Sequence, residues 1–119
     1  MKKLLWSVIA TLVLSQNALA GVNTIEVQIE SVGIIATAFG GHQAGNMEIK
    51  IKNGFQLPSG VYCDTSYITT KKKIDSDRAM FSLLRDAKVS GGTVQLIITD
   101  DKAHSAYSGR CSLLAAVLL

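Results

Sequence analysis

The sequence predicts a small, mainly β domain with a single helix. Three observations carry this prediction. Most apolar residues after position 21 follow the two-residue alternation of half-buried strands, one segment changes to the helical period, and turn signals separate the segments. We expect one domain over residues 21–119, because a chain of this length supports a single hydrophobic core.

The first predicted strand is long and covers residues 24–39. Apolar side chains occupy every second position from Ile25 to Ile29, and Gly33 interrupts the alternation further along. A glycine inside a strand is typical of a bulge or a sharp bend, so we expect the strand to bend at Gly33. Long bent strands are a feature of β-barrels. Residues 40–46 follow as a flexible turn.

Two more strands are predicted before the helix. Residues 47–52 alternate apolar and charged side chains, and Asn53-Gly54 ends this strand with a turn signal. Residues 61–69 are rich in β-branched and aromatic side chains, which favours a third strand.

The helix is predicted over residues 76–89. Asp75 or Ser76 can cap its first turn, and the apolar residues between positions 80 and 87 recur at the i, i+3, i+4 and i+7 spacing of one helical face. Gly91-Gly92 ends it.

The last two predicted strands cover residues 93–99 and 110–119, with a polar loop at 100–109 between them. The final strand is apolar whichever way it is turned. An uncharged, apolar strand at an open sheet edge invites aggregation. We therefore expect this strand to be covered on both faces, either by the helix and the core or by a neighbouring subunit.

The N-terminus predicts export. Lys2 and Lys3 precede the apolar residues 4–14, which are too few to span a bilayer, and Ala18-Leu19-Ala20 supplies a small-x-small cleavage site. We predict a signal peptide over residues 1–20, a periplasmic or secreted mature chain, and no transmembrane segment in it. The alternative is a membrane anchor that is retained.

Charge and cysteine content narrow the function class. The chain has 12 Lys and Arg against 9 Asp and Glu, and loss of Lys2 and Lys3 leaves ten against nine. A net charge of +1 excludes the strong basic surface of a nucleic-acid-binding protein.

In an oxidising compartment Cys63 and Cys111 are predicted to form a disulfide. The alternative, a metal site, lacks histidines at ligand spacing.

Catalytic candidates are few. His42 and His104 both fall in predicted polar loops, and neither has a nucleophile and an acid beside it in the sequence. Asp100-Asp101 with His104 is compatible with a metal or acid/base cluster, but we favour a solvated turn. No phosphate-binding loop is present. We predict a non-catalytic protein without cofactor or metal.

The order β-β-β-α-β-β with a bent first strand is that of the OB-fold, a five-stranded, partly open barrel. The arrangement resembles the B subunits of AB5 toxins, including the pertussis-like branch. The residues that carry the resemblance are Val61-Tyr62-Cys63, the helix at 76–89, residues 90–94 and Gly109-Arg110-Cys111. The part before residue 61 matches only by strand order. The resemblance implies an OB-like barrel, a disulfide from strand to strand, assembly into a ring and recognition of a cell-surface glycan.

Candidate ligand contacts lie on the third predicted strand and the loop after it. They are chosen for polarity and reach: Tyr62, Asp64, Thr65, Tyr67 and Lys71. The lysine run at 71–73 can bind an anion or an acidic glycan, whereas a solvated loop is the simpler interpretation. We predict an exported binding domain whose partners are its own copies and a glycan or another exported protein. The alternative is a monomeric periplasmic protein, such as a protein-binding inhibitor or an envelope factor.

Overall fold

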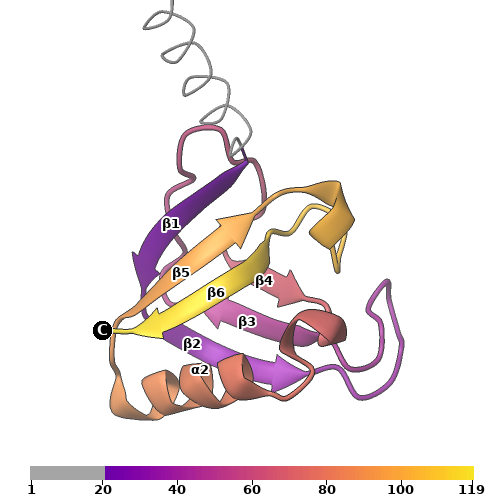
Figure 1. Ribbon diagram of the computed structural model, residues 1–119, viewed down its shortest axis with the longest axis horizontal. Coiled ribbons are helices and arrows are strands. Elements are labelled where there is room, and N and C mark those ends of the chain that lie inside the picture. The colour runs from indigo at the N-terminus through magenta and orange to yellow at the C-terminus, as the bar shows by residue number, and fades with distance from the viewer. Residues whose placement is uncertain (1–20) are drawn as a thin grey trace, which may run out of the picture.

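The computed structural model describes residues 21–119 (Figure 1). The predicted signal peptide, residues 1–20, lies outside the described residues. In chain order the elements are β1 (Val22–Val27), β2 (Ile29–Ile34), β3 (Met47–Ile51), β4 (Tyr67–Thr70), the short 3-10 helix η1 (Lys72–Asp75), α2 (Ala79–Ser90), β5 (Val94–Thr99), the 3-10 helix η2 (Lys102–His104) and β6 (Ser112–Leu118).

The strands form two small antiparallel sheets. One has the order β1-β5-β6 and the other β2-β3-β4. Helix α2 packs against β2 and β6, and so closes the lower end of the molecule (Figure 1). Buried aliphatic side chains from both sheets and from α2 form one core. The mainly β class with one α-helix is therefore confirmed for the described residues.

The first predicted strand is in fact two strands. β1 pairs with β5 and β2 pairs with β3, so the chain leaves one sheet at Gln28 and enters the other. The register shifts between Ile29 and Ser31, whereas Gly33 lies opposite Glu48 in regular pairing. The bend predicted at Gly33 is therefore wrong in position. Ile29 pairs with Ile51 and Ser31 with Lys50, so Glu30 is the extra residue that displaces the strand by one position.

The third predicted strand is much shorter than residues 61–69. Only β4 is a strand, and the segment before it is a loop. Asp64 holds this loop, because its Oδ2 accepts hydrogen bonds from the backbone N–H of Ser66 at 2.9 Å and of Tyr67 at 2.7 Å. An aspartate that binds the backbone two and three residues ahead competes with strand pairing.

Helix α2 begins three residues later than predicted, at Ala79. Asp75 nevertheless caps it, as one of the two predicted cap residues. Its Oδ1 accepts from the N–H of Met80 at 2.9 Å and its Oδ2 from that of Phe81 at 3.0 Å. Gly91, at φ 71°, ends the helix in the left-handed conformation that glycine adopts without strain.

Replacing Asp75 should weaken α2 measurably. The carboxylate is buried and satisfies two N–H groups that no residue of the helix can pair. We expect Asp75→Ala to lower the free energy of unfolding by about 1–2 kcal/mol in urea titrations. Asp77→Ala is the matched control, because Asp77 is exposed and accepts only from Ala79. Equal losses in the two variants would contradict the assigned cap.

The predicted disulfide between Cys63 and Cys111 is present, with the two Cα atoms 5.4 Å apart. Its two ends differ from the prediction, because Cys63 lies in the loop before β4 and Cys111 directly precedes β6. Ile68 and Cys111 form an isolated parallel bridge, and Thr69 donates its N–H to the Cys111 carbonyl at 3.1 Å. The disulfide therefore fastens the loop before β4 to the point where the two sheets meet.

The C-terminal strand is only partly covered within a single chain. Leu113 is fully buried, whereas Leu114 is 36% exposed, and Val117 and Leu118 are each 44% exposed. The expectation that the helix and the core cover both faces is therefore wrong for one chain. Cover by a neighbouring subunit stays a prediction.

Candidate functional site

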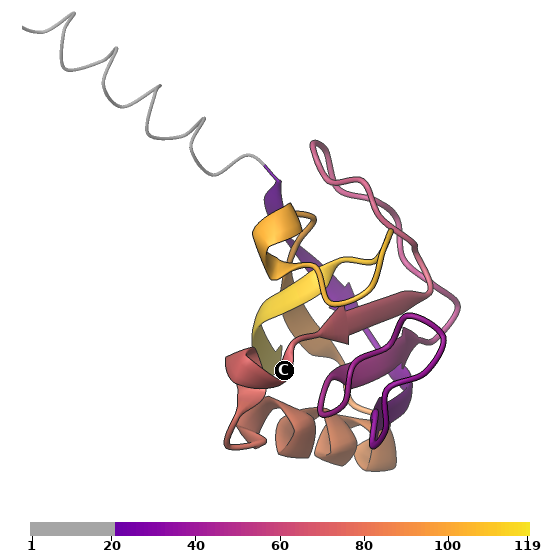
Figure 2. The same ribbon diagram turned by 90° about the vertical axis from the view of Figure 1, so that its right-hand side faces the viewer.

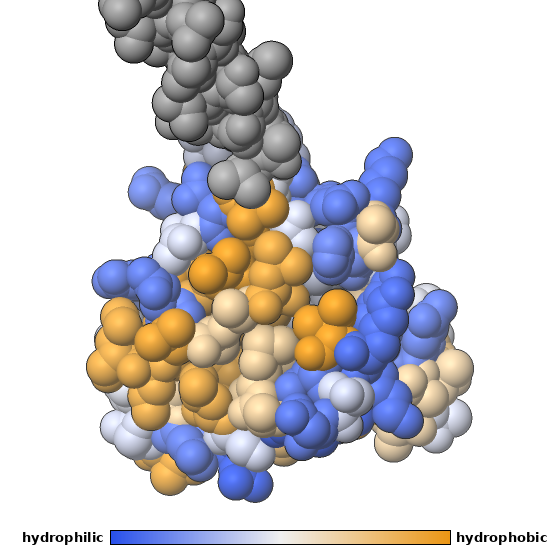
Figure 3. Space-filling model, viewed as in Figure 1, coloured by the Kyte–Doolittle hydropathy of each residue, from blue (hydrophilic) through white to orange (hydrophobic). Residues whose placement is uncertain are grey.

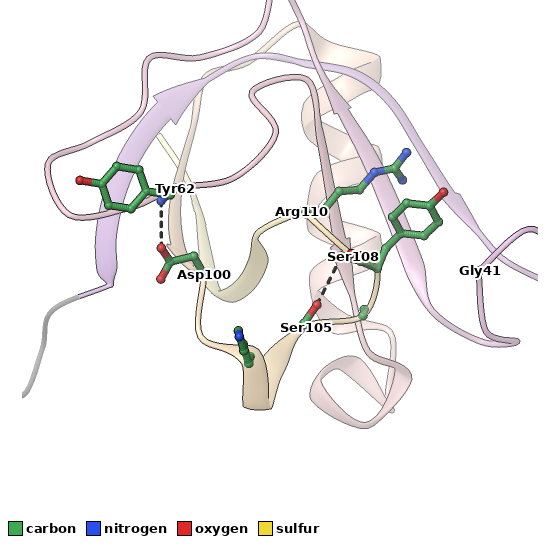
Figure 4. Close-up of a pocket in the computed structure, with 10 residues that line it drawn as sticks. Gly41, Tyr62, Asp100, Ser105, Ser108 and Arg110 are labelled. Carbon is green, nitrogen blue, oxygen red and sulfur yellow. Dashed lines mark hydrogen bonds between the residues drawn. The ribbon is translucent and has the colours of Figure 1, made fainter.

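A hollow of about 510 Å³ opens between three loops (Figure 4). Most of its wall belongs to the loop from β5 to β6, and the loop after β2 and the loop before β4 complete it. Tyr62 and Asp100 stand at one end of the hollow, and Ser108 and Arg110 at the other. The lining residues are Gly41, Tyr62, Asp100, Lys102, Ser105, Ala106, Tyr107, Ser108, Gly109 and Arg110.

Internal hydrogen bonds fix the shape of the loop from β5 to β6. Asp101 caps η2, because its side chain accepts from the N–H of Ala103 at 3.1 Å. The buried Ser112 hydroxyl donates to the His104 carbonyl at 2.7 Å. The Lys71 ammonium donates to the Ala103 carbonyl at 3.1 Å from the opposite side. The wall of the hollow is therefore held in shape by contacts within the protein itself.

Tyr62 presents its ring to solvent at the rim of the hollow. The side chain is 80% exposed, and its backbone N–H donates to Asp100 Oδ2 at 2.9 Å. This bond joins the loop before β4 to the end of β5 and fixes where the ring stands (Figure 4). An exposed aromatic ring on a fixed backbone is a ready stacking surface.

Arg110 lies between two tyrosine rings. Its guanidinium carbon is 4.2 Å from the Tyr107 ring centroid and 4.6 Å from that of Tyr67. Its Nη1 donates to Glu48 Oε2 at 2.9 Å and to Thr69 Oγ1 at 3.2 Å. Stacking on the two rings and the ion pair with Glu48 together fix the orientation of the guanidinium group.

The same row of planar groups continues beyond Tyr107. The His42 ring lies 4.4 Å from Tyr107 and 5.1 Å from Phe39, measured between centroids. His42 Nε2 also approaches Glu48 Oε2 at 3.5 Å. We call Phe39, His42, Tyr107, Arg110 and Tyr67 the planar row. It runs from the loop after β2, where Phe39 is largely exposed, to β4.

A surface ion pair lies at the Tyr67 end of the planar row. Lys50 Nζ lies 2.8 Å from Glu30 Oε2 and 5.8 Å from the Tyr67 centroid. The hydrogen bond and charge of Lys50 lower the pKa of Glu30, and those of Glu30 raise the pKa of Lys50. Both groups therefore stay charged over the neutral pH range.

The five predicted ligand contacts do not lie together. Tyr62 lines the hollow, and Tyr67 ends the planar row. Asp64 binds its own loop, and the Thr65 carbonyl accepts from the N–H of Phe55 at 3.0 Å. Lys71 supports the loop from β5 to β6. Two of the five therefore lie at the hollow or in the planar row, and the other three hold the loops around them.

Sequence reasoning missed most of the planar row. The alternation places Phe39 at the end of a predicted strand, and His42 and Asp100 fall in predicted polar loops. No local pattern marks Tyr107 or Arg110 as ligand contacts. The usable signal is a ring-bearing residue in each polar loop, His42 and Tyr107, since loops carry binding residues more often than strands do.

Two other kinds of site are lacking in the described chain. Residues 21–119 contain no group of three or more His, Cys, Asp or Glu side chains placed to hold a metal ion. Asp101 and His104 approach each other at 3.5 Å, but as a pair only. No helix in this part of the chain is long and apolar enough to cross a membrane.

Comparison with known proteins adds no relative. No protein family, no curated protein and no solved structure matches this chain.

Proposed function

We propose that this protein is a non-catalytic binding domain with an OB-like barrel, which recognises a glycan at the hollow and the planar row. Two features support the barrel. β1 and β2 follow each other with only Gln28 between them, and the parallel bridge from Ile68 to Cys111 links β4 to the segment that enters β6. That bridge supports the strand neighbours expected for an OB-fold, although the strands form two separate three-stranded sheets.

The position of the site supports the same proposal. OB-folds bind oligosaccharides and oligonucleotides on the face of their second and third strands and on the two loops beside it. In the OB-like order, β3 and β4 are those strands, and the loops after β2 and after β5 are those loops. The hollow and the planar row lie on these elements, and both loops face the viewer in Figure 2.

The chemistry of the site favours a sugar over a nucleic acid. Exposed rings of Phe39 and Tyr62 offer stacking faces, and Asp100, Ser105 and Ser108 offer oxygen atoms for hydroxyl groups. The Arg110 charge is already paired with Glu48, so it adds little attraction for a phosphate backbone. The single observation that carries the proposal is the planar row standing beside a preformed polar hollow.

Assembly of copies would strengthen a weak single site. Several linked sites bind a multivalent surface far more tightly than one site does. The ring implied by the resemblance is the most specific form of the proposal, and a monomeric periplasmic protein is its competitor. Light scattering on the mature protein separates them, because a monomer at high concentration excludes the ring.

Variants of the site test the proposed function. We expect the disulfide-bonded mature protein to bind a subset of glycans on an array, and Tyr62→Ala and Tyr107→Ala each to weaken that binding about tenfold, which corresponds to about 1.4 kcal/mol. Val89→Ala is the control, because Val89 is exposed on α2, away from the hollow. Binding that is absent throughout, or unchanged in both tyrosine variants, would refute the proposal.

A further inference from the structure

Apolar side chains gather along the exposed face and end of β6. The strand carries Leu114, Val117 and Leu118 to the surface, and Leu119 continues the same run at 62% exposure. Figure 3 shows this apolar surface extending over β5 and β6 to the C-terminal end. An exposed apolar patch of this kind marks an interaction surface in a folded protein.

The backbone of β6 also has an open edge. The Leu119 N–H donates to the Thr93 carbonyl at 2.9 Å, so alternate residues of the strand point toward β5. The residues between them, Ala116 and Leu118, direct their N–H and C=O groups away from β5. Within residues 21–119 these groups have no backbone partner, because the contact with β4 ends near Leu113.

The opposite edge of the same sheet is protected. On β1 the Asn23 side chain accepts from the Thr24 N–H at 2.8 Å, and the exposed Glu26 adds a charge. Monomeric proteins protect their edge strands with such features, and β6 has neither a charge nor a proline. The two edges of one sheet therefore differ, and only β6 is suited to accept another strand.

We propose that a second copy of this chain pairs with β6, edge to edge and antiparallel. A lipid surface would cover the leucines but could not satisfy the backbone groups of Ala116 and Leu118. The β6 strand of a second copy would cover the leucines and would also pair with these backbone groups. Pairing centred on Ala116 places only uncharged side chains of the two strands against each other, so charge repulsion is absent. The β1-β5-β6 sheets of the two copies then join into one continuous sheet.

This contact is an alternative to the ring within the proposed function, and it does not depend on the ligand. It is a two-fold contact, in which the same surface is used by both copies. A ring of copies would need a second, different contact. The mass in solution and its response to β6 variants therefore distinguish this inference from the ring.

Ala116→Pro tests the pairing directly. Proline removes an N–H that makes no bond to β5, so the internal ladder is kept and only the open edge is blocked. Glu26→Pro is the matched control, because Glu26 alternates with residues that face β5 and lies on the protected edge. We expect twice the single-chain mass for the wild type and Glu26→Pro by light scattering, and a monomer for Ala116→Pro and for Leu118→Asp.

Hydrogen exchange on the unmodified protein gives an answer that no folding defect can obscure. We expect the Ala116 and Leu118 amides to be protected at high protein concentration and to exchange rapidly on dilution. A monomeric wild type overturns both this inference and the ring. A ring that Ala116→Pro and Leu118→Asp leave intact overturns this inference alone. A monomer that binds neutral phosphatidylcholine vesicles through β6 overturns it in favour of a membrane surface.

Discussion

Removing the Cys63–Cys111 disulfide is expected to lower the free energy of unfolding by about 4 kcal/mol. The bond closes a loop with a sequence separation of 48, and the chain-entropy model gives about this value for such a loop. Single domains of this size have a total stability of about 5–15 kcal/mol. The loss is therefore a large share of what keeps the domain folded.

The double variant Cys63→Ala with Cys111→Ala is the appropriate test, because it leaves no free thiol. Its denaturation midpoint should fall to that of the reduced wild-type protein, and both should lie well below that of the oxidised wild type. Should all three proteins unfold at the same denaturant concentration, the disulfide would not stabilise the junction between the two sheets.

A charge at Leu113 is expected to unfold the domain. Leu113 is fully buried in the core, and its N–H donates to the Thr70 hydroxyl at 3.1 Å. Leu113→Asp removes an apolar side chain worth about 2 kcal/mol and buries a carboxylate without a partner, which costs several kcal/mol more. Together these losses equal or exceed about 5 kcal/mol, the lower limit for a stable domain.

The neighbouring residue is the matched control for Leu113. Leu114 lies at the register shift between β5 and β6 and is partly exposed, so Leu114→Asp should keep the circular dichroism spectrum and the disulfide. We expect Leu113→Asp to yield no folded exported protein. Unfolding of both variants, or of neither, would contradict the difference in burial between Leu113 and Leu114.

Local patterns predicted those elements whose residues interact with near neighbours. The strict alternation of residues 47–52 became β3, and Asp75 caps α2 through residues five and six positions ahead. The pattern failed where a local hydrogen bond outweighed β propensity. Asp64 turns its segment into a loop although the residues around it favour a strand.

The candidate site was largely beyond sequence reasoning because its contacts are long-range. Tyr67 and Arg110 meet only because β4 and the start of β6 lie side by side at the bridge from Ile68 to Cys111. The disulfide was predictable from the compartment that the N-terminal sequence predicts, but which aromatic residues lie near it was not. The His42 ring lies 4.4 Å from the Tyr107 ring although the two residues are far apart in the sequence, a contact with no periodic signal.

The most direct test of the central claim is a map of amide chemical shifts on the isotope-labelled mature protein, titrated with the glycan that binds best on the array. The account predicts that the Gly41, Tyr62, Ser108 and Gly109 amides shift in proportion to bound ligand, whereas those of α2 and β6 do not. Shifts that cluster on α2 or β6 and leave the hollow unchanged would contradict a binding site between these loops.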